Sequence, residues 1–455
     1  MITPNLFLNA ATDDEMIQKA VNKANKKKTY VNIPKYNKRT NSNIWIITKA
    51  ILLNSNSKII LNGCHLRMAD NVFTNMFKNS NCDYYGDVLD KRQRNIKIIG
   101  KNNPLLDGGE YNGLSERNSF KKGLPSIREN NLIRLSNVEN IKISNLSIKD
   151  QRYWGLCFTF CSKGTINYIN FSSAGNVPNQ DGIDLRLGCH DFVIKNITGC
   201  TGDDVIALTA LADSSKGIKH EIAGLKNNIW NIKIKHVHAY GVCGNAMIRL
   251  LNHDHRKIYN IKIKDVLETS PYSKNDLSVA VNPDSENNLD SNGLFKVKKP
   301  TKVGENGYRL SACIRLGEQF WFKNEKGQLG DIYNINIKNV KTHARFAIAV
   351  LNNLIDSKFK NINIFGNGFM AVYFGEGIYE NLTFNNIRYQ NPILLHKDDE
   401  KIDIDWNNVH TKGYFAIYGY KQECRNVVFD KVEYPFGFDG LTNIKNLNIK
   451  NLKTY

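Results

Sequence analysis

An asparagine followed by alternating apolar and polar residues recurs along most of this chain. The pattern appears as NIKIIG at 95, NIKISNLSIKD at 140, NYINFSS at 167, NIKIKHVHA at 231, NIKIKDVLE at 260, NINIKNVKT at 334, NINIFGN at 361 and NLNIKNLKTY at 446. Alternation over a few residues predicts short β-strands. Several copies lie roughly 20 to 30 residues apart, which is a typical spacing for the stacked coils of a solenoid.

A second set of apolar segments runs between the copies of this pattern. It includes GIDLRLG, DDVIALTA, NAMIRLLN, ACIRLGE, FAIAVLN, MAVYFGE and FAIYGY. Each coil thus supplies at least two strands, and the remaining chain implies a third. A β-propeller is disfavoured because its blades need about 40 residues with hairpin turns, and NG and DG pairs are too sparse here to supply those turns.

We therefore predict an all-β fold, a single-stranded right-handed parallel β-helix whose strands pair with their equivalents in the next coil. One domain would cover residues 1–455, with coils over residues 31–455. Insertions near 101–130, 267–311 and 388–415 are predicted to form the walls of a groove.

Residues 1–30 are predicted to cap the first coil with a helix. In ATDDEMIQKAVNKANKKK, Thr12 is the expected N-cap, acidic residues fill the first turn and lysines the last. An uncovered coil end would offer unpaired backbone groups to other chains, so a cap is expected there. The apolar side of the helix should face the core, and it comprises Met16, Ile17, Ala20 and Val21.

The chain is strongly basic, with 62 Lys and Arg against 43 Asp and Glu and a formal net charge of +19. Such a balance favours an acidic partner, for example nucleic acid, an anionic surface or an acidic polysaccharide. The alternative is that the lysines of the repeated NIKI segments simply point into solvent. Both interpretations stay open at this point.

Cysteines and apolar runs indicate no disulfide framework and no membrane segment. The nine cysteines include no CxxC pair and stand mostly in apolar runs such as GLCFTF, so they are predicted to be buried hydrophobic residues. No window approaches the roughly 18 apolar residues of a membrane span. The first residues lack the features of a signal peptide, which predicts a cytoplasmic protein, although a chain whose signal had been removed would look the same and would be secreted.

Three aspartates stand out in the stretch NQDGIDLRLGCHDFVIKNITGCTGDDVIALTAL. Asp181 precedes GIDLRL and Asp203 precedes DVIALTA, so the 22 residues between them would be one coil. Asp181 and Asp203 would then be stacked neighbours, with Asp204 beside them. Carboxylates so close together repel one another unless they share a proton or bind a cation. Either they perform chemistry, or they are turn residues that face water.

These motifs resemble a known family. NQDGID followed by TGDDVIAL is similar to the NxDG and DD motifs of family 28 glycoside hydrolases, polygalacturonase-like enzymes with the pectin-lyase type of β-helix. The resemblance covers roughly residues 10 to 350 and implies hydrolysis with inversion, without a cofactor. Asp203 would match the general acid, Asp181 and Asp204 would hold the attacking water, and Asn179 would orient the cluster.

The chain departs from the family pattern further along. Asn245, in CGNAMIRLL, stands where the family has a histidine, and asparagine cannot titrate. The Arg-x-Lys pair that holds the substrate carboxylate in the family is incomplete. Arg249 is followed by Leu251, and Arg315 by Gly317, where the lysine should be. Galacturonan is therefore only one of the substrates to consider.

Aligning the apolar strands predicts further contacts with a sugar chain. Arg186, Arg249 and Arg315 would fall in one outward column with Leu208 between them, suited to carboxylate or sulfate groups. The alternative is that neighbouring acids pair with these arginines. Trp154, on the coil before Asp181, would either stack on a sugar ring or pack in the core.

The spacing of HVH and HDH allows a metal site because alternate strand residues share a face. His236 and His238 flank one side of the NAMIRLL strand, and His253 and His255 the other. No further ligands are evident, so no metal is predicted. We instead expect His253 to contact substrate.

The predicted function is hydrolysis of an oligo- or polysaccharide, neutral or anionic, with no nucleic-acid or membrane partner. Whether the chain is a monomer or a homo-oligomer stays undecided. Two alternatives remain: a polysaccharide lyase or epimerase on the same scaffold, and a non-catalytic carbohydrate-binding or adhesion β-helix.

Overall fold

The computed structural model describes all residues except 83–90, 111, 113–129, 175–178, 212–223, 242–245, 254, 271–311, 318–327, 352, 367, 369, 393–401, 405–408, 412–414, 420–421, 435–440, 443–445 and 455. The described chain falls into two compact units, and each is described by itself. The first comprises the described residues up to 206 together with 224–227, and the second comprises 207–211 and the described residues from 228 onward. The predicted groove walls lie largely outside the described residues. That the chain forms one domain stays a prediction.

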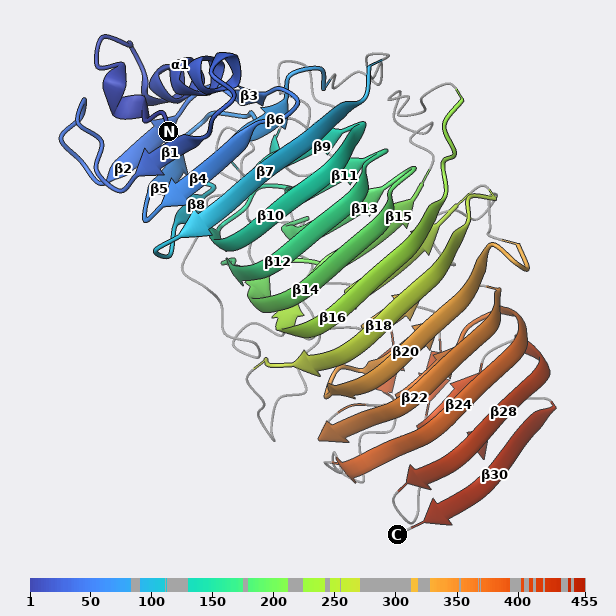
Figure 1. Ribbon diagram of the computed structural model, residues 1–455. Coiled ribbons are helices and arrows are strands. Elements are labelled where there is room, and N and C mark those ends of the chain that lie inside the picture. Colours follow the sequence, from blue (N-terminus) through green and yellow to red (C-terminus); the bar gives the residue numbers. More distant parts are fainter. Residues whose placement is uncertain are drawn as a thin grey trace. The chain divides into compact units, whose positions relative to one another are not determined.

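The first unit is a stack of parallel coils that begins with two short helices, η1 (Pro4–Leu6) and α1 (Asp13–Lys26). One parallel sheet follows the order β1 (Val31–Pro34), β4 (Lys58–Asn62), β7 (Gln93–Lys101), β10 (Val138–Lys149), β12 (Ser162–Ser172) and β14 (His190–Thr201). The other contains β3 (Ile51–Leu53), β6 (Phe77–Asn79), β9 (Ile133–Ser136), β11 (Trp154–Thr159) and β13 (Asp181–Arg186). Figure 1 shows the long strands of this unit lying side by side.

The second unit repeats this arrangement. Its long sheet contains β16 (Ile229–Gly241), β18 (Ile258–Glu268), β20 (Ile332–Thr342), β22 (Leu354–Gly366), β24 (Gly377–Pro392), β28 (Gln422–Tyr434) and β30 (Leu447–Thr454). Its short sheet contains β17 (Ala246–Asn252), β19 (Ala312–Leu316), β21 (Phe346–Val350), β23 (Met370–Phe374), β27 (Phe415–Gly419) and β29 (Leu441–Thr442). Strand β15 (Ile206–Ala210) lies where the chain passes between the units, and β25 (Ile402–Ile404) pairs antiparallel with β26 (Val409–Thr411).

Each repeated NIKI segment lies in or directly before a strand of a long sheet, so the predicted parallel β-helix is confirmed. The third strand of each coil is separate only near the start, as β2 (Ile44–Ile47), β5 (His65–Met68) and β8 (Leu105–Asp107). From β10 onward it is continuous with the second strand, because β10 pairs with β7 along its first half and with β8 along its second.

Asparagines at the coil corners explain why the repeat begins with that residue. Asn56, Asn95 and Asn140 all have a positive φ, a conformation that asparagine tolerates better than most residues. The Asn140 amide donates to Asn95 Oδ1 at 2.6 Å, and the Asn95 amide donates to Asn56 Oδ1 at 2.7 Å. Each corner thus supplies a side-chain hydrogen bond to the next coil in addition to the backbone ladder.

The core consists of columns of like residues. Ile98, Ile143, Ile166 and Ile194 are paired strand to strand in the first unit and are fully buried. The cysteines that the structure describes are free thiols and all are buried except the partly exposed Cys200, so the prediction of buried hydrophobic cysteines holds for the rest.

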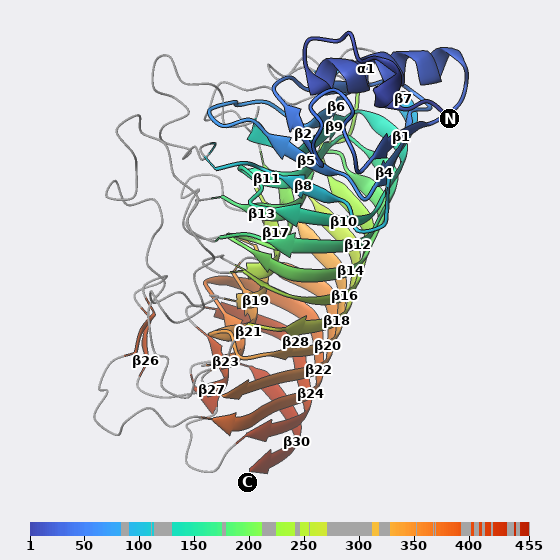
Figure 2. The ribbon, with the colours of Figure 1, turned by 90° about the vertical axis from the view of Figure 1, so that its left-hand side faces the viewer.

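Helix α1 covers the first coil, as Figure 2 shows. Thr12 is its N-cap and accepts a hydrogen bond from the Glu15 amide at 3.3 Å. Asp14 accepts from the amide and the hydroxyl of Thr48, at 3.2 and 2.9 Å. The predicted helix, cap residue and apolar face are confirmed, since all of the following are buried: Met16, Ile17, Ala20 and Val21.

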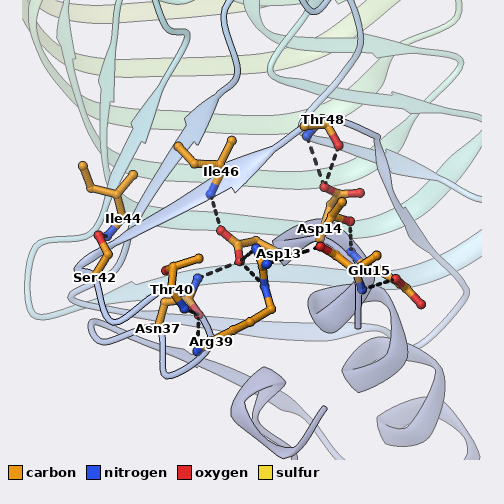
Figure 3. A network of polar contacts seen from close by, with 12 residues as sticks. Asp13, Asp14, Glu15, Asn37, Arg39, Thr40, Ser42, Ile44, Ile46 and Thr48 are labelled. Carbon is orange, nitrogen blue, oxygen red and sulfur yellow. Dashed lines mark hydrogen bonds and ion pairs between the residues drawn. The ribbon is translucent and has the colours of Figure 1, made fainter. Parts of the chain in front are cut away.

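Asp13 fastens this helix to the first coil (Figure 3). Its Oδ1 accepts from Asn37 Nδ2 at 2.7 Å and from Arg39 Nη2 at 2.6 Å, and its Oδ2 accepts from the Ile46 amide at 2.8 Å. The carboxylate is buried, so these donors replace the water that it loses.

Replacing Asp13 with alanine should therefore lower the free energy of unfolding by about 2 to 4 kcal/mol, because buried donors lose their acceptor. Urea denaturation followed by circular dichroism would measure this. The partly exposed Glu15, which pairs with Lys19 at 2.7 Å, is the control. Glu15→Gln should leave the unfolding curve unchanged, and equal effects for both variants would contradict a specific docking role of Asp13.

Candidate active site

The predicted catalytic stretch begins where β13 follows β11 in the stack. Trp154 and Asp181, the first residues of these strands, lie directly opposite each other, and the Asp181 amide donates to the Tyr153 carbonyl at 3.1 Å. The next residue, Gly182, has no room for a side chain, because a Cβ atom there would lie 2.6 Å from the Val205 carbonyl oxygen. The backbone of the following coil therefore comes unusually close to the residue next to Asp181.

The backbone hydrogen bonding between the segment around Asp181 and the next coil shifts by one residue at Gly202 and Asp203. The amides of both donate to the Gln180 carbonyl, at 3.1 and 3.3 Å. Just beyond, the Gly182 amide donates to the Asp204 carbonyl at 2.9 Å, and Ile183 donates to Val205 at 3.0 Å. One residue of the later coil thus has no counterpart, as in a β-bulge, and the predicted 22-residue offset lengthens by one at the corner before β15 begins.

This irregularity places Asp203 and Asp204 at the corner that faces Asp181. The Asp203 carbonyl is fixed by the Thr201 hydroxyl, which donates to it at 2.7 Å. Gly202 is required for the close approach, because a Cβ atom there would lie 2.6 Å from Cβ of Gln180. Asp181 and Asp204 are buried, at 6% and 1% exposure, whereas Asp203 is half-buried. Asp203 is thus the carboxylate of the three that is most open to a ligand.

Two glutamines that the sequence interpretation missed hold this corner together. Gln151 Nε2 donates to the carbonyls of Gln180 and Asp181, at 3.1 and 3.3 Å, and Gln180 Nε2 donates to the Gln151 carbonyl at 3.0 Å. The Ser173 hydroxyl donates to Gln151 Oε1 at 2.9 Å. The signal for them was a glutamine near the start of two successive coils, in DQRYW and NQDGID.

Asn179, predicted to orient the cluster, is half-buried and has a φ of +57°. This left-handed conformation favours an asparagine at that position, and its role in orienting the aspartates stays a prediction.

Trp154 and Arg186, both predicted to contact substrate, contact each other. The Arg186 guanidinium lies 4.6 Å from the centre of the Trp154 ring. The same ring stacks on Tyr153 with a centroid distance of 4.1 Å. Trp154 and Arg186 are 7% and 6% exposed. These contacts fit the packing alternative for Trp154, and a cation–π pair of this kind stabilises the strand next to the aspartates.

A buried charged cluster precedes Trp154 on its coil. Arg152 donates to the Gly109 carbonyl, and burial lowers the pKa of its guanidinium to about 10. Burial raises the pKa of the neighbouring Asp150 carboxyl, whose Oδ1 accepts from the Ala174 amide at 2.9 Å. At 1% exposure, Arg152 is a structural residue of this coil.

The remaining predicted residues belong to the second unit. Arg249 on β17 and Arg315 on β19 lie directly opposite each other and are 7% and 1% exposed. The predicted alignment of these two arginines is confirmed, whereas their contact with a sugar chain stays a prediction. Leu208, expected on the outer face, is fully buried among the core residues, so that part of the prediction is wrong. Asn245 lies outside the described residues.

His253 follows β17 and is buried at 2% exposure. Its amide donates to the Ala210 carbonyl at 3.2 Å, and its own carbonyl accepts from the Arg256 amide at 3.2 Å. Its backbone therefore helps to close the corner after β17. Contact with substrate stays a prediction.

A further acidic corner in this unit was not anticipated. Glu268, at the end of β18, accepts hydrogen bonds from the Thr342 hydroxyl and from the amides of His343 and Ala344, the latter two at 3.1 and 2.9 Å. Ser270 Oγ donates to Glu268 Oε1 at 2.7 Å and lies 2.7 Å from His343 Nε2. The only sequence signal was an acid directly after the apolar part of NIKIKDVLE.

Across the described ranges, no three His, Cys, Asp or Glu side chains are grouped so that they could hold a metal ion. Within the same ranges, no helix is both long and apolar enough to cross a membrane.

The segment that contains this corner matches a known family. Residues 73–270, which include Asp181, Asp203 and Asp204, match the family described as "Glycosyl hydrolases family 28". The match covers less than half of the 455-residue chain and shows that this segment is similar to family 28 glycoside hydrolases. The resemblance drawn from NQDGID and TGDDVIAL is thereby confirmed at the level of the family. No curated protein matches the sequence.

Solved structures with a similar fold include two polygalacturonases and a phage protein. The exopolygalacturonase of Yersinia enterocolitica is 12% identical, with a TM-score of 0.45 over 100% of this chain and 77% of its own. The polygalacturonase of Erwinia carotovora is 14% identical, with a TM-score of 0.42 over 98% and 91%. The tailspike of E. coli bacteriophage HK620 is 12% identical, with a TM-score of 0.50 over 96% and 74%, a likeness of fold alone.

The glutamine network predicts a specific effect of mutation at this corner. Gln151→Ala removes both donors that hold the carbonyls beside Asp181, so we expect about 2 to 3 kcal/mol less stability and a lower kcat on any substrate of the wild type. Ser173→Ala is the control, because it removes one hydrogen bond and leaves those donors in place. Urea denaturation and steady-state kinetics measure both effects. An unchanged kcat in Gln151→Ala would contradict a positioning role.

Proposed function

We propose that the chain cleaves an acidic oligo- or polysaccharide by single-displacement hydrolysis with inversion. Asp203 is the general acid, and Asp181 and Asp204 hold and activate the water. The observation that carries this proposal is the extra residue at Gly202 and Asp203, which brings a half-buried carboxyl group to the corner occupied by two buried ones.

The differences in exposure suit these roles. A general acid must reach the glycosidic oxygen of a substrate, and Asp203 is the most exposed of the three side chains. Asp181 and Asp204 are enclosed, and carboxylates so placed can keep a water molecule in a fixed orientation. Neighbouring negative charges also make proton loss from the acid harder, which keeps it protonated until it reacts.

In the proposed step, the proton of Asp203 passes to the leaving oxygen as the bond between that oxygen and the anomeric carbon breaks. Water attacks the opposite face of the sugar and gives its proton to Asp181 or Asp204. The product is a hemiacetal of inverted configuration. This geometry requires the acid and base carboxyl groups to be about 6.5 to 9.5 Å apart, with water between them.

The acidic nature of the substrate is inferred from charge. Arg249 and Arg315 lie side by side on neighbouring strands, and paired guanidinium groups suit a carboxylate or sulfate. The formal net charge of +19 also favours an anionic substrate.

The test is to incubate the wild type and Asp203→Asn with neutral, uronic and sulfated oligosaccharides and to follow the products by proton NMR. We expect new reducing ends of inverted configuration from the wild type, and a rate lower by about a thousandfold or more in the variant, which cannot donate the proton. Asp191→Asn, at an exposed acid on the same coil, is the control and should retain full activity.

Each other outcome points to a different function. Vinylic proton signals would identify a lyase and would overturn hydrolysis. Products of retained configuration would exclude the water-mediated step. If no oligosaccharide is cleaved but one of them is bound, the protein would be a carbohydrate-binding β-helix.

A further inference from the structure

The long sheet of the second unit presents a regular array of lysines on its outer face. Strands β16, β18 and β22 contribute exposed lysines at two matching positions each, and β20 contributes one. We call this array the lysine lattice, and it comprises Lys233, Lys235, Lys262, Lys264, Lys338, Lys358 and Lys360.

The lattice follows from strand register. In one column Lys235 pairs with Lys264, Lys264 with Lys338, and Lys338 with Lys360. In the other, Lys233 pairs with Lys262, and Asn336 stands between Lys262 and Lys358. Neighbouring strands are about 4.8 Å apart, and alternate residues along a strand about 6.6 Å. Both spacings are shorter than the Debye length of about 8 Å at physiological ionic strength, so the lysines act on an anion together.

No side chain of the chain's described part neutralises this array. None of the seven lysines forms an ion pair with a described residue. The nearest acids in sequence are held at corners, where Asp265 bonds to His236 Nδ1 at 2.5 Å and Asp356 accepts from Asn381 at 3.0 Å.

The next two strands of this long sheet carry cross-strand ion pairs, on either side of the positions in register with the lattice. Arg388 on β24 pairs with Glu433 on β28 at 3.0 Å, and Arg425 approaches Glu380 to 3.8 Å. The long sheet thus accommodates paired opposite charges, yet the lattice positions on the four preceding strands carry no acidic side chain. Like charges held opposite each other oppose strand pairing, so this arrangement is costly unless an anion compensates it.

An aromatic stripe borders the lattice on the same strands. Trp230, Tyr259 and Tyr333 pair in register and are half-buried. Tyr259 and Tyr333 are stacked with a centroid distance of 4.8 Å. The face therefore offers apolar edges beside a double row of cations, a combination that suits the ring faces and carboxylates of an acidic sugar chain.

We propose that the lysine lattice is a binding surface for an acidic polysaccharide, separate in sequence and in sheet from the family 28 aspartates. The choice of a polysaccharide rests on the proposed function, because the substrate of a glycoside hydrolase that cleaves acidic polysaccharides is itself a polyanion. The flat, rigid, regularly spaced array matches an extended polymer with one charge per sugar. Binding there would hold the enzyme on its polymeric substrate and would not alter cleavage of short fragments.

The test is affinity electrophoresis of the full chain through gels containing polygalacturonate, in an Asp203→Asn background so that the polymer stays intact. The lattice variant carries glutamine in place of Lys235, Lys264, Lys338 and Lys360. The charge-matched control carries glutamine in place of exposed lysines elsewhere, namely Lys26, Lys27, Lys35 and Lys38. A second lattice variant, with arginine at the four lattice positions, keeps the charge, and thermal denaturation verifies folding.

We expect the glutamine lattice variant to lose about tenfold or more in affinity for polygalacturonate, with binding that weakens as salt rises. The control should lose less than about twofold, and the arginine variant should bind like the parent. Equal losses in lattice and control variants would overturn the proposal. Tighter lattice-dependent binding to duplex DNA or to phosphatidylserine vesicles than to polygalacturonate would overturn the choice of occupant.

Kinetics separate this inference from the proposed function. With Asp203 restored, the glutamine lattice variant should show a raised KM on polymer and unchanged kcat and KM on short oligosaccharides. A loss on short oligosaccharides as well would contradict a separate binding surface. Lattice-dependent binding without any hydrolysis would refute the proposed function and leave the binding surface standing.

Discussion

Parallel backbone hydrogen bonding between coils is the constraint on which both units depend. Each strand must meet the next in register, so a residue at one position has its equivalents above and below it. Like residues then stack, as in the column of Ile98, Ile143 and Ile166 in the first unit and the rings of Phe359, Phe384 and Phe429 in the second. The same rule acts on the outer face, where it aligns the lysines. A single repeated pattern thus determines both the core and the surface.

The sequence was sufficient to predict the features that repeat. The NIKI segments indicated the strands, and Thr12 marked the start of the helix. These signals are local, and each recurs or follows simple capping rules. The family motifs likewise pointed to Asp181, Asp203 and Asp204, because each motif is a short continuous stretch of the chain.

What the sequence did not indicate depends on contacts between coils. The extra residue at Asp203 is visible only as a change in which carbonyl accepts from which amide. The role of Gln151 requires knowing that it reaches the carbonyls of a residue pair on the next coil. Leu208 was placed outside because a uniform offset was assumed for all coils, and the burial of Trp154 depends on Tyr153 and Arg186 together. Such features arise from tertiary structure, and periodicity carries no information about them.

The extra residue at the Gly202 and Asp203 corner also bears on how such a protein can change over evolutionary time. In a strand, an insertion of one residue would turn every following side chain to the opposite face. At a corner, the added residue lies outside the hydrogen-bonded ladder. The apolar side chains of the next strand therefore still point into the core. Corners are therefore the positions at which a coil can acquire a new chemical group by insertion, so that new reactivity can arise there without a redesign of the core.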